Sequence, residues 1–309
     1  MNSAKFMTLI FMTFFSVLVF GHEKKDVGEK VTTLEEAHQV FVEAMRSHVV
    51  ADLAGDQSLG DALYFYEPKE MNCSRVIFIC GGMGPEAGFL AWIHTIEKFP
   101  QRKIVLDQRC SIPDRTEAIL EGMDGLKAKE VIVKLRDSFI LASFYGTSVN
   151  SVDIFVSCNT AHAFVEPALN LLAQEVRNHL KIHSLIKIAV HKAYLLHEKT
   201  LVLSTTGTRK AALYTKELGT RLVKKEELPE DKQENLMKAI YEGIKKRDKI
   251  AALKYGMLAL QDLFQRTRNI TIIAACTEIP ILLSLMEKAG VDLKQIKVVN
   301  PISEVLLGL

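Results

Sequence analysis

The chain has 309 residues, of which 48% are hydrophobic and 25% are charged, and its formal net charge is +2. These are ordinary values for a globular protein, and the length is sufficient for two compact domains. The basic residues are scattered and form no stripe interleaved with aromatic side chains, which argues against nucleic acid as a partner.

Residues 1–21 have the features of a secretory signal peptide. Lys5 precedes the uncharged run Phe6 to Phe20, and a charged segment follows Gly21. A short positive region, an apolar run and small residues near its end are typical of such a signal. The run is shorter than the roughly 20 residues that span a membrane. We therefore expect export to the periplasm or the medium and no membrane contact after cleavage, with an uncleaved membrane anchor as the alternative.

Residues 22–72 form an N-terminal extension in which apolar residues at helical spacing predict a helix over 33–53. Thr32 with Glu35, and Thr33 with Glu36, both fit a capping box at its start. A helix of this kind is expected to pack on a domain surface.

From Arg75 onward, short apolar runs that predict strands alternate with helical segments. The predicted strands are Arg75–Cys80, Lys103–Leu106, Val131–Leu135, Val152–Ser157, Ile186–Val190, Thr200–Leu203, Asn269–Ala274 and Lys297–Val299. The predicted helices include Pro167–Leu180 and Lys232–Arg247. Continuous apolar strands separated by helices favour parallel sheets covered on both faces, which is an α/β fold.

One pattern occurs twice within this alternation. A strand runs into a glycine turn, first at Gly81–Gly84 and again at Thr205–Thr208, and a later strand ends in Cys158–Thr160 or in Cys276–Glu278. The repetition predicts two similar α/β domains, the first formed by residues 73–185 plus 291–309 and the second by residues 186–290. The strand at 297–299 and the helix after Pro301 are expected to return to the first domain.

The two cysteine turns, Cys158–Thr160 and Cys276–Glu278, both lie where a strand ends and a helix begins. The amino end of a helix binds carboxylates and stabilises thiolates. Two thiols on opposite sides of one ligand suit the inversion of a carbon centre, because one sulfur removes a proton and the other delivers one from the opposite face. Cys158 and Cys276 are therefore the candidate catalytic pair, and backbone N–H groups would stabilise the carbanion.

Five motifs in this order resemble the aspartate/glutamate racemase family, most closely its aspartate racemases. They are Gly81–Ala87, Ile112–Thr116, Cys158–His162, Thr205–Thr208 and Cys276–Pro280. The resemblance runs from about Arg75 to the C-terminus. It implies two pseudo-symmetric doubly wound domains with the active site in the cleft between them. It also implies racemisation of an acidic amino acid by two cysteines, with no cofactor and no metal, often by a homodimer.

The resemblance assigns further residues to the site. The expected substrate-binding residues are Met83, Arg115, Asn159, Thr160, Ala161, Lys216, Thr277 and Glu278. Arg115 and Lys216 would hold the side-chain carboxylate, since a guanidinium can grip a carboxylate at two points. His162 either supports the neighbouring thiol or only caps its helix. Glu278 stands where glutamate racemases of the cell-wall type usually carry histidine, which favours an aspartate-type or broad specificity.

Several alternatives stay open at this level. Gly82-Met83-Gly84 with Ala87 and Asp107 partly matches a dinucleotide fingerprint, but that interpretation leaves the duplicated cysteine turns unexplained. The same site could instead isomerise maleate, decarboxylate a malonate, or bind an amino acid without catalysis. If Cys158 and Cys276 are working thiols, at most one disulfide can form among Cys73, Cys80 and Cys110, and the sequence does not select it.

Overall fold

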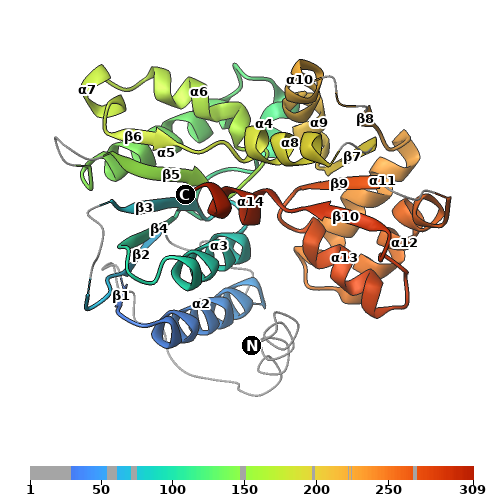
Figure 1. Ribbon diagram of the computed structural model, residues 1–309, viewed down its shortest axis with the longest axis horizontal. Helices are drawn as coiled ribbons and strands as arrows, with labels where there is room; N and C mark the ends of the chain where they lie inside the picture. The colour runs from blue at the N-terminus through green and yellow to red at the C-terminus, as the bar shows by residue number, and fades with distance from the viewer. Residues whose placement is uncertain are drawn as a thin grey trace.

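The computed structural model describes residues 29–53, 61–70, 75–146, 151–196, 199–221, 223, 225–266 and 270–309. The predicted signal peptide and Cys73 lie outside these residues. Within them, the strands form two sheets flanked by helices (Figure 1). No helix of the described part is long and apolar enough to cross a membrane.

The first sheet has the strand order β1-β2-β4-β3-β5-β6. Its strands are β1 (Glu29–Val31), β2 (Ala62–Tyr66), β3 (Ile77–Gly81), β4 (Ile104–Gln108), β5 (Val152–Val156) and β6 (Leu180–Ile182). All pairs are parallel except β2 with β4. Strand β2 belongs to the N-terminal extension, so the strands from Arg75 onward pair in parallel in this sheet, as the sequence predicts. The link between β2 and β3 is shorter than the dozen or so residues that a parallel crossover needs.

The second sheet is parallel throughout and has the order β10-β9-β7-β8. Its strands are β7 (Lys199–Ser204), β8 (Lys225–Glu226), β9 (Ile270–Ala275) and β10 (Ile296–Val299). Strand β10 pairs with β9, so the strand predicted at 297–299 does not return to the first domain. Helix α14 (Pro301–Gly308) does return, because Ile302, Val305 and Leu306 pack in the core of the first sheet.

Helices cover both faces of each sheet because successive strand residues are buried on opposite sides. In β3, Ile77 and Ile79 pack in one core cluster, whereas Phe78 and Cys80 pack in another. The remaining helices are α2 (Leu34–Leu53), α3 (Pro85–Lys98), α4 (Arg115–Glu121), α5 (Leu126–Ser143), α6 (His162–Asn170), α7 (Gln174–Arg177), α8 (Leu185–Leu195), α9 (Thr206–Lys210), α10 (Leu213–Thr220), α11 (Glu230–Lys238), the π-helical segment η2 (Ala239–Ile244), α12 (Lys249–Arg266) and α13 (Ile279–Lys288).

Some predicted elements differ from the structure. The runs Val131–Leu135 and Ile186–Val190 were predicted as strands but lie inside α5 and α8. Their β-branched residues suggested strands, yet the buried positions recur three or four residues apart, which is the helical period. The segment Pro167–Leu180 divides between the end of α6, α7 and the first residue of β6, and Lys232–Arg247 contains α11 and η2.

The N-terminal extension adds β1, α2 and β2 to the first sheet. Helix α2 begins with the predicted capping box, since the Glu36 amide donates to Thr33 Oγ1 and the Thr33 amide donates to Glu36 Oε2. Its Phe41 contacts Phe89 of α3, with 5.7 Å between the ring centroids. The extension therefore covers the apolar face of α3 (Figure 1).

Candidate active site

The carboxyl ends of strands from both sheets meet at one cavity. Such strand ends are where parallel α/β sheets usually bind ligands. The residues that line the cavity are Met83, Asp114, Arg115, Thr116, Cys158, Asn159, Thr160, Thr205, Tyr241, Lys245, Cys276, Thr277 and Glu278. The two cysteine turns thus reach one cavity from different sheets.

Cys276 lies just before α13 and is held by the carboxylate two residues further along. Its Sγ donates to Glu278 Oε2 at 2.8 Å, and Thr277 Oγ1 donates to the same oxygen at 2.9 Å. Burial raises the pKa of the Cys276 thiol well above its ordinary value, and the charge of Glu278 raises it further. Cys276 is therefore a protonated thiol at neutral pH.

Cys158 lies just before α6 and has a positively charged neighbour, Arg115. Burial lowers the pKa of the Arg115 guanidinium, but interactions with Cys158 and Asp114 outweigh this, so that the pKa lies above its ordinary value. Arg115 Nη1 donates to the carbonyl of Pro113 at 3.0 Å, and Nη2 donates to the carbonyl of Met83. The Arg115 guanidinium lies beside Cys158, whereas the Glu278 carboxylate lies beside Cys276, so the two cysteines have neighbours of opposite charge.

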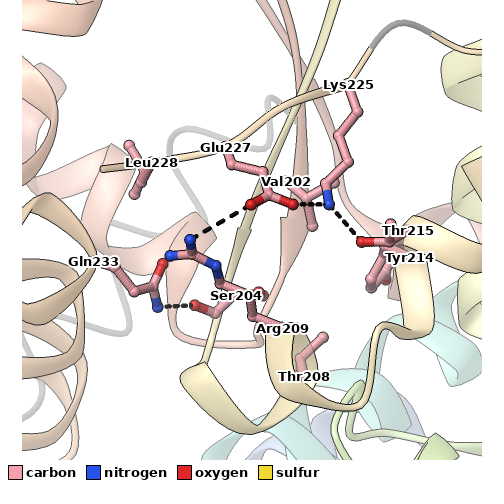
Figure 2. Close-up of a pocket in the computed structure, with 10 residues that line it drawn as sticks. All are labelled: Val202, Ser204, Thr208, Arg209, Tyr214, Thr215, Lys225, Glu227, Leu228 and Gln233. Atoms are coloured by element: carbon pink, nitrogen blue, oxygen red, sulfur yellow. Dashed lines mark hydrogen bonds and ion pairs between the residues drawn. The ribbon is translucent and has the colours of Figure 1, made fainter. Parts of the chain in front are cut away.

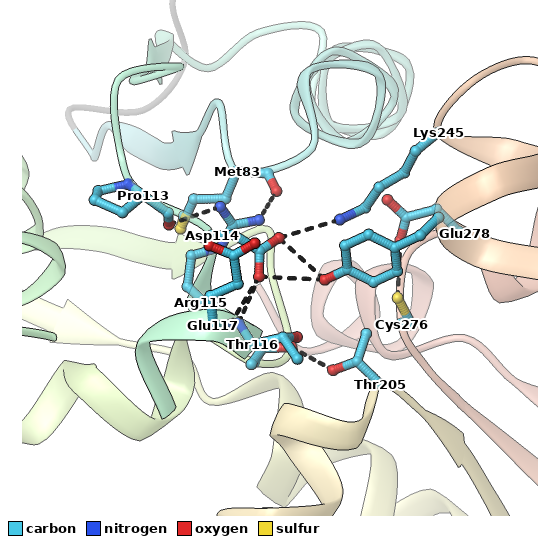
Figure 3. Close-up of polar contacts among 12 residues, drawn as sticks. Met83, Pro113, Asp114, Arg115, Thr116, Glu117, Thr205, Lys245, Cys276 and Glu278 are labelled. Atoms are coloured by element: carbon cyan, nitrogen blue, oxygen red, sulfur yellow. Dashed lines mark hydrogen bonds and ion pairs between the residues drawn. The ribbon is translucent and has the colours of Figure 1, made fainter. Parts of the chain in front are cut away.

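A second cation enters the cavity from η2. Lys245 Nζ lies 3.4 Å from Asp114 Oδ2 and 3.7 Å from the centroid of the Tyr241 ring, and the Tyr241 hydroxyl donates to both oxygens of Asp114 (Figure 3). Burial lowers the pKa of Lys245, but Glu278, Tyr241 and Asp114 outweigh it and the pKa is raised. Lys245 is therefore charged.

Buried hydroxyl groups join the two halves beside the site. Thr160 Oγ1 lies 3.0 Å from Thr205 Oγ1 and 2.8 Å from Thr208 Oγ1. The Tyr214 hydroxyl of α10 donates to Asn159 Oδ1. Thr208 and Tyr214 line a neighbouring cavity between β7, α9 and β8, where Lys225 and Arg209 both contact Glu227 (Figure 2). The two cavities therefore share a wall.

The structure brings most of the predicted site residues together but not all of them. Ala161 is buried and does not line the cavity, and Lys216 is exposed on α10 and does not reach it. Lys245 takes the position that sequence reasoning gave to Lys216. No spacing signal pointed to Lys245, because its placement depends on the π-helical segment η2. Asp114 also lines the cavity and was not predicted as a site residue. It belongs to the motif Ile112–Thr116, and its acidic side chain next to Arg115 was the signal that could have pointed to it.

His162 supports the Cys158 turn through the backbone and not through the thiol. Its Nδ1 lies 3.0 Å from the Cys158 carbonyl oxygen, and its Nε2 accepts from the Leu185 amide at 3.2 Å. Burial lowers the pKa of His162 to about 4, so the ring is neutral and both nitrogens are used. Of the two alternatives that the sequence leaves open for His162, this geometry favours a structural role at the start of its helix.

Cys80, Cys110, Cys158 and Cys276 are all free thiols. Among the described residues, no group of three or more His, Cys, Asp or Glu side chains is arranged to hold a metal ion.

Solved structures of racemases are similar to this chain. An aspartate racemase from Picrophilus torridus matches with a TM-score of 0.58 and 21% identity over 76% of this chain and 92% of that chain. An aspartate racemase homologue from Pyrococcus horikoshii matches with a TM-score of 0.54 and 17% identity over 76% of this chain and 96% of that chain. A glutamate racemase isoform from Bacillus anthracis matches with a TM-score of 0.51 and 17% identity over 76% of this chain and 79% of that chain. No protein-family model matches the sequence.

The fold is therefore that of the aspartate and glutamate racemases, with two α/β domains. The identities, near 20% or below, carry the architecture alone, and the activity must be argued from the cavity.

Proposed function

We propose that this chain racemises an acidic amino acid, aspartate or glutamate, with Cys158 and Cys276 as the two proton-transfer groups. The observation that carries the proposal is that cysteines from equivalent turns of two sheets line one cavity, one beside a guanidinium and the other bonded to a carboxylate. A racemase needs this difference, since one group must start as a base and the other as an acid.

The surroundings of the cysteines define their starting roles. Cys158, which lies beside the Arg115 guanidinium, acts as the base that removes the α-proton from one face and becomes a thiol. Cys276 delivers its proton to the opposite face and becomes a thiolate, which completes the inversion. Glu278 then lies beside a thiolate. The resting state is restored when Cys158 loses its proton and Cys276 gains one, either by exchange with solvent or by turnover of the opposite enantiomer.

The charged side chains favour a substrate with two carboxylates and one ammonium group. Arg115 and Lys245 supply positive charge, and Asp114 and Glu278 supply negative charge, all around one cavity. Carboxylates would bind near the cations and the amino ends of α6 and α13, and the ammonium group near the acidic side chains. A neutral amino acid would offer Lys245 no side-chain carboxylate and would leave Asp114 as its ion-pair partner.

The direct test is α-proton exchange in deuterium oxide. Pure L- or D-aspartate, and then each enantiomer of glutamate, is incubated with the protein, and α-deuterium is followed by NMR while optical rotation is followed in parallel. We expect both deuterium incorporation and loss of optical rotation. Cys158→Ser and Cys276→Ser should each slow inversion by about 10²- to 10⁴-fold, whereas Cys110→Ser, a free thiol outside the cavity, should not.

Other outcomes separate the alternatives. Turnover of maleate or a malonate with inert amino acids would favour a different reaction of the same site. Tight aspartate binding without exchange would favour a binding protein. Export and homodimer formation stay predictions from the sequence.

A further inference from the structure

The hydroxyl of Tyr214 forms a hydrogen bond to the residue that directly follows Cys158. Tyr214, on α10 beside the second sheet, is 2% exposed, and its hydroxyl donates to Oδ1 of Asn159, which is also 2% exposed. Asn159 directly follows Cys158 and lines the cavity, whereas Tyr214 lines the neighbouring cavity (Figure 2). The hydrogen bond crosses the wall between the two cavities and the junction between the two halves.

An asparagine side chain presents a carbonyl oxygen on one side and an NH₂ group on the other. With Oδ1 held by Tyr214, the NH₂ group is the part left to face the cavity, and no partner for it is found among the described residues. A rotated amide would instead present a carbonyl oxygen to a negatively charged substrate. The orientation therefore decides whether this side chain stabilises or repels a carboxylate.

We propose that Tyr214 is a positioning residue that fixes the Asn159 amide with its NH₂ group towards the substrate α-carboxylate, where negative charge grows as the α-proton leaves. This role rests on the proposed racemase function. Donors fixed before the reaction stabilise developing charge more effectively than donors that must reorient. Burial raises the pKa of Tyr214 well above its ordinary value, and the nearby Cys276 adds to this, so that the phenol stays a donor.

The hydroxyl is not the sole connection between the halves at this point. The Thr160, Thr205 and Thr208 hydroxyls form their own cluster across the junction. The change Tyr214→Phe keeps the buried ring and removes only the donor. Its effect on the amide can therefore be separated from an effect on the junction.

The test is a double-mutant cycle on deuterium exchange with the full chain. We expect Asn159→Ala to lower kcat by about 10²-fold, and Tyr214→Phe to lower it by at least about tenfold, with a KM change of less than about threefold. In the Asn159→Ala background, Tyr214→Phe should cause no further loss, since no amide remains to be oriented. A purely structural role would lower activity in both backgrounds.

Tyr66→Phe is the matched control. Tyr66 is also a buried residue, and it lies on β2, outside the cavity. Its hydroxyl donates to the Pro100 carbonyl at 2.6 Å. The change Tyr66→Phe should lower thermal stability without lowering kcat. The positioning role of Tyr214 alone is overturned by either of two results in a system whose wild-type protein exchanges the α-proton. One is that the losses in kcat from Tyr214→Phe and Asn159→Ala multiply in the double variant. The other is that Tyr214→Phe leaves kcat unchanged. Wild-type protein that exchanges no α-proton overturns the racemase function together with this role.

Discussion

Glu278 stabilises the protonated form of the Cys276 thiol. Because a carboxylate accepts the S–H of Cys276, the change Glu278→Gln removes a negative charge beside the sulfur and should lower the pKa of Cys276. The rate of iodoacetamide alkylation of Cys276, followed by peptide mass spectrometry, should then rise at a lower pH than in the wild-type protein. Alkylation of Cys158 is the internal control, and an unchanged profile for Cys276 contradicts the assignment.

Lys245 is the cation that we expect to select acidic substrates. The change Lys245→Met should raise KM for aspartate by about 10- to 100-fold, the range for losing one charged hydrogen bond, and should affect kcat less. Lys216→Met is the matched control, because Lys216 is exposed and outside the cavity. Initial rates of exchange at several substrate concentrations measure both constants. A larger effect at Lys216 than at Lys245 would restore the sequence-based assignment.

At the scale of elements, η2 places Tyr241 and Lys245 in the cavity. Gly243 sits within it, and a Cβ there would lie 2.5 Å from Ala252 Cα and 2.6 Å from Ala252 N. Since a backbone cannot yield cheaply, Gly243→Ala should destabilise the protein by about 1–3 kcal/mol and raise KM. Gly219→Ala in α10 meets nothing within 4 Å and should leave both quantities nearly unchanged. Urea unfolding and exchange kinetics check the pair.

The first residues of β5 depend on a buried ion-pair cluster far from the cavity. Asp153 is 1% exposed and contacts Arg102 at 2.7 Å and His183 at 2.9 Å. Burial raises the pKa of Asp153, but the hydrogen bonds from His183 and Arg102 outweigh it, so that the pKa lies below its ordinary value. Asp153→Asn removes the charge that pairs with the buried Arg102 guanidinium and should lower the free energy of unfolding by about 3–5 kcal/mol at neutral pH.

The sign of the pH dependence follows from the lowered pKa. The ionised Asp153 stabilises the folded state above the pKa of an unfolded aspartate, about 3.9, and this contribution is lost as the pH falls towards the lower folded value. The difference between wild type and Asp153→Asn should therefore shrink in urea unfolding below about pH 4. Asp137→Asn, in an exposed pair with Arg136, should change stability by less than about 0.5 kcal/mol.

Local sequence signals predicted the turns better than the strands. The turns at Cys158 and Cys276 combine several residues whose chemistry works only at a strand end, so they were located correctly. The run at Val131–Leu135 misled because β-branched residues favour strands locally, while burial against the sheet imposes a helix. Lys245 could not be predicted, since the wider winding of η2 changes which residues face the cavity.

At the scale of the whole molecule, the N-terminal extension is part of the first domain's core. Phe89 and Trp92 of α3 are 3% and 0% exposed, and Tyr64 of the extension contacts both rings. A variant that begins at residue 75 loses this cover and leaves β4 as an open edge, so it should aggregate or melt at a lower temperature. A variant that begins at residue 29 should not. Light scattering and thermal melts distinguish them, and equal behaviour would contradict the packing argument.

The division into two α/β halves was predictable from the duplicated turns, whereas the path of the C-terminus was only partly so. Strand β10 and helix α14 are adjacent in sequence but pack in different halves. That choice depends on which edge and which face remain uncovered, and such information is spread over the whole chain.

The proposed racemase reaction obeys a thermodynamic limit that does not depend on the unlike neighbours of the two sulfurs. The two enantiomers of an amino acid have equal free energies in water. The equilibrium mixture is therefore racemic, whatever effect Arg115 and Glu278 have on the rates in the two directions. If kcat differs between the L and D substrates, KM must differ by the same factor, so that kcat/KM is the same for both. A steady excess of one enantiomer around this protein would thus reveal a separate process that consumes the other.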